Sequence, residues 1–547
     1  MQKTALISVY NKTGIEKFAK ELVDLGWKII SSGGTAKALI DAKIPVTDVA
    51  EITGMPAILS HRVATLHPKI HGGLLALNIP EHLAELEKYE IPWIDLVCAD
   101  FYPLEEEIAK QTSFPLGRIE EGLKLVLEKT DIGGPTMIRS GAKGRRITIC
   151  DIEDRIKVIE WLKAGEPERE EFLNNLAAKA EAVIARYCSL SGEFHSEGVY
   201  KGIFGKKNFE CAYGENAYQK PASLYQNLNG NNNLAIHNWQ LVAGSPMSYN
   251  NFCDLDRMMQ TITHIGAGFE KNFGKVPNIA IGAKHGNACG ASFSENEIEA
   301  IDKMLLGDLR AIFGGSIMLN FPVDEKIAEE LIHKFCEPKE NPMRRLLDVV
   351  AAPFFTKEAI EILSRKKGKC RLLVNKNIEK AGLNSLDISK RFRYVRGGFL
   401  EQPNYTFVPE LNPSLFLPLS GEEKIQNLIL AWAIGSTSNS NTITLVKDGR
   451  LMGNGVGQQD RVGAAKLAIL RADDANNSKA DLENAVAYSD SFFPFPDAVE
   501  VLINRGIKTI FSTSGSINDE KIIELCKSKG VELIMLPDSE ARGFYQH

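Results

Sequence analysis

The strongest constraint on the fold is an alternation of short apolar runs and amphipathic stretches at the start of the chain. Residues 4–10, TALISVY, are apolar, and residues 13–26 follow with an apolar stripe on one helical face. A second apolar run, residues 27–32, leads through GGT into another helical stretch from about Ala36. Alternation of this kind predicts a parallel sheet covered by helices. We therefore expect the first domain to be α/β.

Local signals place further elements in this domain. Thr13 and Glu16 have the spacing of a capping box, which predicts the start of the first helix. Residues 94–102, IDLVCADFY, are expected to form a strand that ends at Tyr102. The glycine-rich stretch 130–144, TDIGGPTMIRSGAKG, is expected to be a loop, with a strand and a long helix after it.

The second half of the chain is also expected to be α/β, with some antiparallel pairing. Residues 277–283, PNIAIGA, predict a strand, and residues 442–455 predict a hairpin with Asp448-Gly449 at its turn. The tail again alternates helix and strand. We place the domain boundary near residue 200, which gives domains 1–200 and 201–547, and no internal repeat is visible in the sequence.

Composition excludes several classes of function. With 547 residues, a net charge of −6 and 44% hydrophobic residues, the chain is expected to be globular and to lack the positive field that binds nucleic acid. No apolar run reaches the roughly 18 residues of a membrane helix, and the start of the chain has no secretory pattern. Nine cysteines, an odd number without metal-like spacing, predict reduced thiols in a cytoplasmic protein.

Two loops in the first domain have the chemistry of an anion site. SVYNKTG, residues 8–14, and SSGGT, residues 31–35, both follow predicted strands. In parallel sheets the carboxyl ends of the strands and the helix amino termini gather ligands, and small residues leave backbone N–H groups free to bind phosphate. Turn chemistry alone explains either loop, but hydroxyls in both and Lys12 in one favour a phosphate site.

The stretch 283–290, AKHGNACG, sets Lys284 and His285 side by side at the end of a predicted strand. Adjacent residues of a strand point to opposite faces, so both side chains reach one substrate only where the backbone turns, and glycines there allow that turn. Histidine takes a proton at neutral pH, and lysine stabilises a developing oxyanion. A surface accident is the alternative explanation of the pair.

Other polar clusters are ambiguous from the sequence. His67 and His71 within RVATLHPKIHGG are better explained as structural histidines than as metal ligands, because no carboxylate lies nearby in sequence. Asp131 and Lys143 bracket the glycine-rich stretch and suit a charge pair that polarises a carbonyl, or a plain salt bridge. In SDSFFPFPD, residues 489–497, core packing is the default, and a wall for a flat heterocycle is the alternative.

A family resemblance runs through nearly the whole chain. The motifs are LISVYNKTGI, SSGGTAKAL, VTDVAEITG, RVATLHPKIHGGLLA, DIGGPTMIRSGAKG, YGENAYQ, MSYNN, AKHGNACG, NGVGQQDR, SDSFFPFPD and RGFYQH. In their order the chain resembles the bifunctional purine biosynthesis family that combines AICAR transformylase with IMP cyclohydrolase. The resemblance implies an N-terminal methylglyoxal-synthase-like doubly wound parallel sheet and a C-terminal α/β transformylase domain built of two cytidine-deaminase-like units.

The resemblance also implies chemistry and partners. The 5-amino group of AICAR would take a formyl group from 10-formyltetrahydrofolate as co-substrate, and the product would lose water and close to IMP. Neither a metal nor a nucleotide coenzyme is implied. The family implies a homodimer with transformylase sites at the subunit interface, acting on small molecules rather than on nucleic acid or membranes.

The family's functional positions carry over to specific residues of this chain. Lys284 and His285 match its transformylase pair, with the histidine as proton acceptor. On the cyclohydrolase side the catalytic positions are Tyr102, Asp131 and Lys143. The phosphate-holding positions are Ser8, Lys12, Ser32, Gly34, Thr35, Arg62 and Thr65. The nucleotide and folate positions are Tyr213, Asn441, Arg461, Phe492, Asp497, Arg542 and Phe544.

Several departures from the family pattern remove positive charge. Ala64 stands where the family has lysine, and Ala212 stands where it has arginine before YGEN. AIGSTSNSN, residues 433–441, replaces a stretch that is usually basic, Gly144 replaces an asparagine, and Gln546 falls near a family histidine. Three interpretations remain open: a divergent bifunctional enzyme, a homologue with one activity or a shifted substrate, and a non-catalytic nucleotide-binding regulator. The retained Lys-His pair counts against the regulator.

Overall fold

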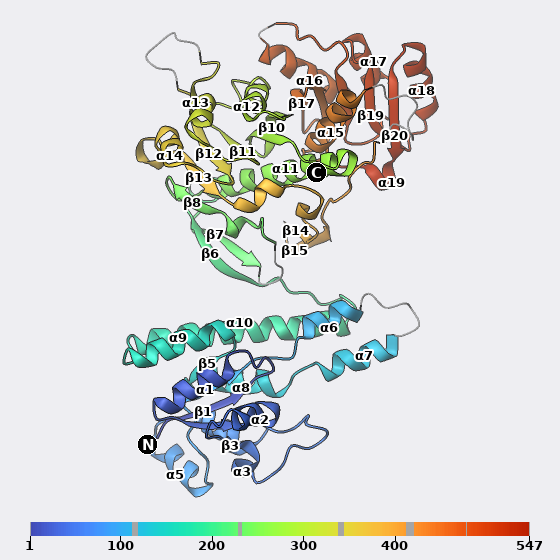
Figure 1. Ribbon diagram of the computed structural model, residues 1–547. Helices are drawn as coiled ribbons and strands as arrows, with labels where there is room; N and C mark the ends of the chain where they lie inside the picture. Colours follow the sequence, from blue (N-terminus) through green and yellow to red (C-terminus); the bar gives the residue numbers. More distant parts are fainter. Residues whose placement is uncertain are drawn as a thin grey trace. The chain divides into compact units, whose positions relative to one another are not determined.

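The computed structural model divides the chain into two compact units, Met1–Phe204 and Gly205–His547. Each unit has its own sheet and its own hydrophobic cores (Figure 1). The structure describes residues 2–111, 119–227, 232–336, 344–411, 421–476 and 478–545. Within these ranges, no helix combines the length and the hydropathy that crossing a lipid bilayer requires.

The first unit is a five-stranded parallel sheet in the order β3-β2-β1-β4-β5. Its strands are β1 (Thr4–Ser8), β2 (Lys28–Ser31), β3 (Thr47–Asp48), β4 (Leu96–Ala99) and β5 (Ile147–Ile149). Its helices are α1 (Ile15–Asp24), α2 (Gly33–Asp41), α3 (Val49–Thr53), α4 (Pro68–Leu75), α5 (Pro80–Lys88), α6 (Leu104–Gln111), α7 (Ile119–Glu128), α8 (Gly133–Lys143), α9 (Ile152–Lys163) and α10 (Arg169–His195).

Alternation along β1 shows why helices cover both faces of this sheet. Ala5 and Ile7 belong to a core cluster with residues of α1 and α9, whereas Leu6 belongs to a second cluster with residues of α4, α8 and α10. Successive side chains of a strand point to opposite faces, so an all-apolar central strand requires cover on both. The predicted doubly wound parallel sheet is confirmed.

Three local predictions for this unit are wrong. α1 begins after Gly14 without a side-chain cap, so Thr13 and Glu16 form no capping box. β4 ends at Ala99, and Tyr102 lies beyond it in the connection to α6. The expected loop 130–144 is largely the helix α8, because its apolar residues recur on one face and are buried against the sheet, which outweighs the poor helix propensity of its glycines.

The second unit is built on an eleven-stranded mixed sheet in the order β20-β19-β18-β16-β17-β10-β9-β11-β12-β13-β8 (Figure 1). Its strands are β8 (Gln240–Ala243), β9 (Asn278–Lys284), β10 (Asn287–Ser294), β11 (Gly315–Leu319), β12 (Leu347–Ala352), β13 (Arg371–Val374), β16 (Ile443–Lys447), β17 (Arg450–Gly455), β18 (Val486–Ser489), β19 (Thr509–Ser514) and β20 (Glu532–Pro537). Two separate ribbons pair β6 (Gly205–Cys211) with β7 (Ala222–Asn227) and β14 (Lys390–Val395) with β15 (Gly398–Pro403).

Helices cover both faces of the large sheet. They are α11 (Tyr249–Phe273), α12 (Glu297–Leu305), α13 (Glu325–His333), α14 (Lys357–Leu363), α15 (Glu422–Ser436), α16 (Arg461–Ala475), α17 (Asp497–Asn504), α18 (Asp519–Ser528) and α19 (Asp538–Ala541). Residues of α11 and α15 share one core cluster, whereas α12–α14 and α16–α18 supply the helical residues of two others. Short 3₁₀ helices occupy Ile236–Asn238, Lys366–Gly368, Lys376–Lys380 and Leu383–Ser385.

The second unit repeats one topology twice. In the first half α11 leads into the β9–β10 hairpin, and then α12, β11, α13, β12, α14 and β13 follow; in the second half α15 leads into the β16–β17 hairpin, and then α16, β18, α17, β19, α18 and β20 follow. Strand pairings match as well, with antiparallel pairs first and parallel pairs after them. The halves join where β10 pairs antiparallel with β17. The structure thus contains a repeat that is invisible in the sequence.

Candidate functional site

A cavity of about 960 Å³ opens in the first unit beyond the carboxyl ends of β1, β2 and β4. This is the position where parallel α/β sheets bind ligands. Nine of the residues predicted from the sequence line it: Ser8, Lys12, Ser32, Gly34, Thr35, Arg62, Thr65, Tyr102 and Asp131. The structure therefore brings together one predicted site from five separate stretches of sequence.

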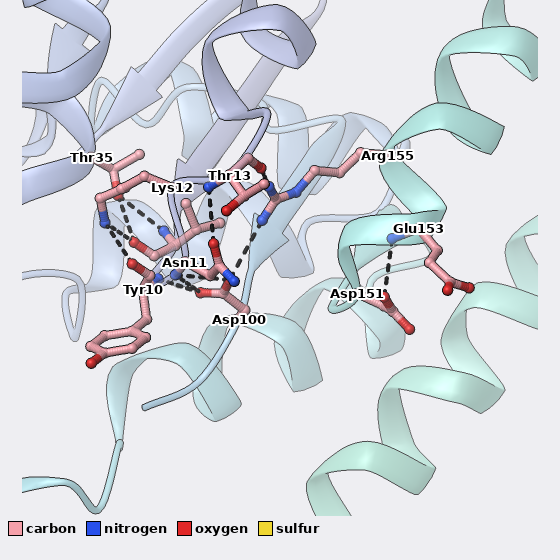
Figure 2. Close-up of polar contacts among 10 residues, drawn as sticks. Tyr10, Asn11, Lys12, Thr13, Thr35, Asp100, Asp151, Glu153 and Arg155 are labelled. Carbon is pink, nitrogen blue, oxygen red and sulfur yellow. Dashed lines mark hydrogen bonds and ion pairs between the residues drawn. The ribbon is translucent and has the colours of Figure 1, made fainter. Parts of the chain in front are cut away.

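The loop after β1 is fixed from two sides (Figure 2). Asp100, just beyond β4, accepts the backbone N–H groups of Tyr10 and Asn11, the latter at 3.1 Å from Oδ2. Thr35, near the start of α2, accepts the N–H of Val9 and donates its hydroxyl to the carbonyl of the same residue, both at 3.0 Å. Because both backbone groups of Val9 are satisfied by one side chain, the loop is held in a single conformation at the cavity wall.

Lys12 lies within this loop and turns back onto it. Its Nζ donates to the carbonyls of Val9 and Tyr10 (Figure 2). Burial lowers the pKa of the Lys12 amine, and the neighbouring carboxylate of Asp100 works against that shift. The site thus has an ammonium at its rim beside a helix amino terminus, a combination that binds phosphate.

Asp131 lies two residues before the start of α8, where its Oδ1 accepts the N–H of Gly134 at 3.0 Å. A Cβ at Gly134 would lie 2.6 Å from Asp131 Oδ2, so the carboxylate position requires glycine there. Burial raises the pKa of the Asp131 carboxyl despite the N–H groups of Gly133 and Gly134. Burial and the nearby Asp131 also raise the pKa of Tyr102. A half-buried carboxylate near a phenol is suited to moving protons.

Two residues that sequence reasoning missed surround Tyr102. The rings of Tyr10 and Tyr102 lie edge to face with centroids 5.4 Å apart, and Lys129 Nζ is 5.5 Å from both centroids. A cation over two aromatic rings is a favourable contact. Lys129 precedes Asp131 by two residues, but nothing in the sequence pairs it with rings more than 25 positions away.

The phosphate candidate Arg62 forms an ion pair with Glu128 at the cavity rim, and both side chains are exposed. Ala64 also lines the cavity, where the family pattern has a lysine. This part of the cavity wall therefore lacks one positive charge that the family resemblance implies.

Lys143 does not line the 960 Å³ cavity. It is the last residue of α8, and ten residues at about 1.5 Å each separate it from Gly133 along the helix axis. It lines a second cavity of about 600 Å³, to which Asp131 also contributes. The stretch between Asp131 and Lys143 is therefore a helix and not a loop. Among the described residues no ion pair joins the two side chains, and their joint action on a carbonyl stays a prediction.

The histidines of RVATLHPKIHGG have structural roles, as the sequence favoured. His67 caps α4, where its Nδ1 accepts the N–H of Lys69 at 3.1 Å, and His71 Nδ1 lies 3.0 Å from Ser140 Oγ. Across the part of the chain that the structure describes, no group of three or more histidine, cysteine or carboxylate side chains is arranged to hold a metal ion.

In the second unit Lys284 and His285 stand where β9 gives way to the turn before β10. His285 has φ 52° and Gly286 has φ 72°, the left-handed pair that a tight two-residue hairpin requires. The predicted turn at the end of the strand is confirmed. Lys284 Nζ donates to the carbonyl of Phe313 at 2.9 Å, and the imidazole of His285 is exposed.

Asp254 on α11 supports this turn and was not identified from the sequence. Its Oδ1 accepts the N–H of Gly286 at 2.7 Å and its Oδ2 accepts the hydroxyl of Ser316 at 3.3 Å. Burial raises the pKa of the Asp254 carboxyl, while the Gly286 and Ser316 donors and nearby His285 oppose that rise. The motif MSYNNFCD is compatible with a helix at Asp254, but it does not predict a contact with a turn 32 residues later.

The nucleotide and folate candidates of the second half gather around Asp490. Arg461, at the start of α16, forms a buried ion pair with Asp490. The carbonyl of Asp490 accepts the N–H of Gly543, beside Arg542, and its own N–H donates to the carbonyl of Thr442, beside Asn441. Three of the predicted positions therefore lie around one buried carboxylate, and Arg461 is already charge-paired there.

Phe492 faces the guanidinium of Arg542 at 5.8 Å, and the next residue, Phe493, is buried in the core. Core packing thus explains Phe493, and a wall for a flat heterocycle stays a prediction for Phe492. Arg542 also donates to Ser491 Oγ and lies 3.2 Å from Asp538. Tail residue Phe544 is half-buried.

The remaining candidates lie at element boundaries. Tyr213 accepts the N–H of Tyr249 at its carbonyl, and Ala212 donates its N–H to the carbonyl of Met247, so YGEN runs beside the start of α11. Asp497 opens α17 and accepts the N–H of Ala498 at 2.8 Å. Gln546 lies outside the described residues.

Comparisons with known proteins match both parts of the chain. The profile of the MGS-like domain matches residues 14–136, and that of the AICARFT/IMPCHase bienzyme matches residues 144–471. A solved structure of ForH covers 36% of this chain and all of its own, with 32% identity and a TM-score of 0.31, which is too low for a comparison of folds.

Curated relatives match over almost their whole length. Bifunctional purine biosynthesis proteins PurH of Anoxybacillus flavithermus and Persephonella marina are 36% and 34% identical to this chain, with 98% of each chain covered. The homologous protein of a Thermoanaerobacter species is 37% identical over the same share. This chain therefore belongs to the AICARFT/IMPCHase bienzyme family of bifunctional purine biosynthesis proteins.

Proposed function

We propose that this protein catalyses both reactions of its family: transfer of a formyl group from 10-formyltetrahydrofolate to AICAR, and closure of formyl-AICAR to IMP with loss of water. Two separate observations carry the proposal: an intact Lys-His turn in the second unit, and a 960 Å³ cavity in the first that is lined by hydroxyls, a lysine and a half-buried carboxylate. Each reaction thus has a separate set of groups with suitable chemistry.

In formyl transfer, the amine of AICAR attacks the formyl carbon and a C–N bond forms. The bond to the folate nitrogen breaks, and that nitrogen takes up a proton as it leaves. The amine must lose a proton as the formyl oxygen becomes negative. His285, exposed at its turn, would accept the proton, and the ammonium of Lys284 would stabilise the oxyanion. Arg461, Arg542, Asn441, Tyr213, Phe492, Asp497 and Phe544 would bind nucleotide and folate.

In ring closure, a carboxamide nitrogen attacks the formyl carbon and water leaves. Tyr102 and Asp131 would move the protons, and Ser8, Lys12, Ser32, Gly34, Thr35, Arg62 and Thr65 would hold the phosphate. Lys143 would assist from the neighbouring cavity that it shares with Asp131. The assignment of residues 1–200 to ring closure and 201–547 to formyl transfer, a cytoplasmic location and a homodimer belong to the same proposal.

A single assay tests the two activities. Purified protein is incubated with AICAR and 10-formyltetrahydrofolate, and release of tetrahydrofolate and of IMP are followed separately. We expect both products; release of neither would overturn the proposal. Lys143→Ala should lower ring closure of supplied formyl-AICAR at least tenfold, with Arg139→Ala in the same cavity as the matched control. Unchanged ring closure would remove Lys143 from the mechanism.

A second candidate function, formyl transfer alone, is favoured by one observation. Ala64 lines the first cavity where the family pattern has a cation. If that lysine is indispensable, tetrahydrofolate would be released without IMP, and formyl-AICAR would accumulate.

A further inference from the structure

Positive charge in the formyl-transfer half of the site is scarce. Segment 433–441, AIGSTSNSN, contains no basic residue. Arg461 is paired with Asp490, and Arg542 lies 3.2 Å from Asp538. A reaction that develops negative charge on an oxygen uses cations that are not already neutralised. Lys284, whose Nζ donates to the carbonyl of Phe313, is one, but it lies outside segment 433–441.

Arg257 on α11 brings such a cation to this segment. Its side chain is buried, with 5% of the residue exposed. Nη2 donates to the carbonyl of Thr437 at 2.8 Å and reaches Oδ1 of Asn439 at 3.2 Å. Within the ranges that the structure describes, the guanidinium forms no ion pair, and its buried Nε has no hydrogen-bond partner. Its hydrogen-bond acceptors are neutral carbonyl and amide oxygens, while the carboxylates of Asp256 and Asp254 act on it only without an ion pair, opposed by the guanidinium of Arg391.

Arg257 also contacts the turn that carries His285. A Cβ at Gly286 would lie 3.2 Å from Arg257 Cγ, so the arginine stem packs against the turn. Nη2 lies 3.4 Å from Oδ1 of Asn287, and the same oxygen accepts the N–H of Asn439 at 3.3 Å. One guanidinium therefore joins the β9–β10 turn to the segment that precedes Asn441.

The charge is retained at neutral pH. Burial lowers the pKa of Arg257 to about 10, which still leaves the group protonated in a neutral solution. Tyr545 covers its other side: the guanidinium is 4.3 Å from the ring centroid, and the phenol donates to Asp256 at 2.6 Å. An aromatic face stabilises a cation without neutralising it.

We propose that Arg257 is the positioning cation of the formyl-transfer site, supplying from α11 the positive charge that segment 433–441 lacks and holding that segment to the His285 turn. The inference rests on the proposed formyl transfer. It assigns to Arg257 two roles, one through its charge and one through its contacts. Substitutions can separate these roles.

Two substitutions separate charge from packing. Arg257→Gln keeps a hydrogen-bond donor and removes the charge, and should lower kcat of formyl transfer at least tenfold. Arg257→Lys keeps the charge and loses the planar fork, and should retain activity within about threefold. Arg345→Gln is the matched control, because Arg345 is also buried on backbone carbonyls, at 2.5 and 2.7 Å from those of Leu331 and Lys334. It should lower the melting temperature but leave kcat within twofold.

A third variant tests the charge without removing the arginine. Asn439→Asp is isosteric and places a carboxylate against the guanidinium, which neutralises it and preserves the hydrogen bond. We expect formyl transfer to fall while the melting temperature is unchanged or higher. In every variant, ring closure of supplied formyl-AICAR is measured in the same preparation and should not change.

The outcomes are distinct. Full activity of Arg257→Gln or of Asn439→Asp, or a loss in Arg257→Lys as large as in Arg257→Gln, would overturn the inference while wild-type transfer still stood. A wild-type protein that transfers no formyl group to AICAR would overturn the proposed function and the inference together.

Discussion

The Asp254 carboxylate accepts the backbone N–H of Gly286 at 2.7 Å and so joins α11 to the turn that carries His285. Both residues of that turn have left-handed φ angles, which a non-glycine residue adopts only when its surroundings hold it there. The helix thus fixes the backbone of the turn that carries the imidazole.

Replacing Asp254 should therefore disable formyl transfer. Asp254→Ala leaves the N–H of Gly286 without its acceptor, a loss of about 1–3 kcal/mol, and we expect kcat to fall roughly tenfold or more. Glu270→Ala is the matched control, because Glu270 on the same helix also accepts a backbone N–H, from Leu383 at 2.6 Å. Equal kcat losses in the two variants, measured by tetrahydrofolate release, would contradict a specific role for Asp254.

His285→Ala should abolish formyl transfer and leave ring closure of supplied formyl-AICAR intact, because the two reactions are assigned to different units. The check is to measure both rates on one preparation. Loss of both activities together would argue against independent sites. Lys284→Met is the companion variant and should affect transfer alone.

Asp131 predicts a dependence of stability on pH. Burial raises its pKa, so the folded protein binds the proton more tightly than the unfolded chain. The ionised carboxylate therefore costs folding free energy above the folded pKa, and this cost disappears as pH falls below the ordinary carboxyl value of about 3.9. Asp131→Asn should raise the melting temperature at pH 7 and abolish ring closure.

The increase in melting temperature of Asp131→Asn over the wild type should become smaller as the pH is lowered. Asp24→Asn, at an exposed carboxylate on α1, is the control and should change neither property. If Asp131→Asn melts at a lower temperature than the wild type at neutral pH, the ionised Asp131 carboxylate stabilises the fold instead.

Ala64→Lys should restore a cation to the first cavity. We expect a several-fold rise in kcat/KM for ring closure, since one exposed charge facing a developing anion contributes about 1 kcal/mol. Ala57 lines the same cavity, and Ala57→Lys is the matched control for non-specific charge. If both lysines accelerate closure equally, position 64 has no special place in the site.

The features that could be predicted from the sequence are those that depend on a few adjacent residues. The hairpin at Asp448-Gly449 was correctly predicted because two adjacent residues determine such a turn; their φ angles are 52° and 73°. The Thr13–Glu16 spacing failed, whereas real capping boxes start α3 at Asp48 and α11 at Ser248. Spacing alone does not reveal which of several candidate caps the tertiary structure uses.

The parts that could not be predicted depend on contacts between distant segments. Arg257 and Thr437 are 180 positions apart, and no periodicity links them. The glycines between Asp131 and Lys143 predict a loop, but burial of the apolar face of this stretch makes it a helix. The first cavity was easier to predict, because the carboxyl ends of the strands in a parallel sheet lie at the same edge.

The twofold recurrence of helix, hairpin and three helix-linked strands in the second unit allows the two hairpin turns to be compared residue by residue. By strand register, His285-Gly286 corresponds to Asp448-Gly449, and Lys284 corresponds to Lys447. A lysine thus precedes both turns, and the imidazole is what distinguishes the first. On the proposed assignment, the first copy supplies the proton acceptor, and the second supplies the recognition residues Asn441, Arg461 and Phe492.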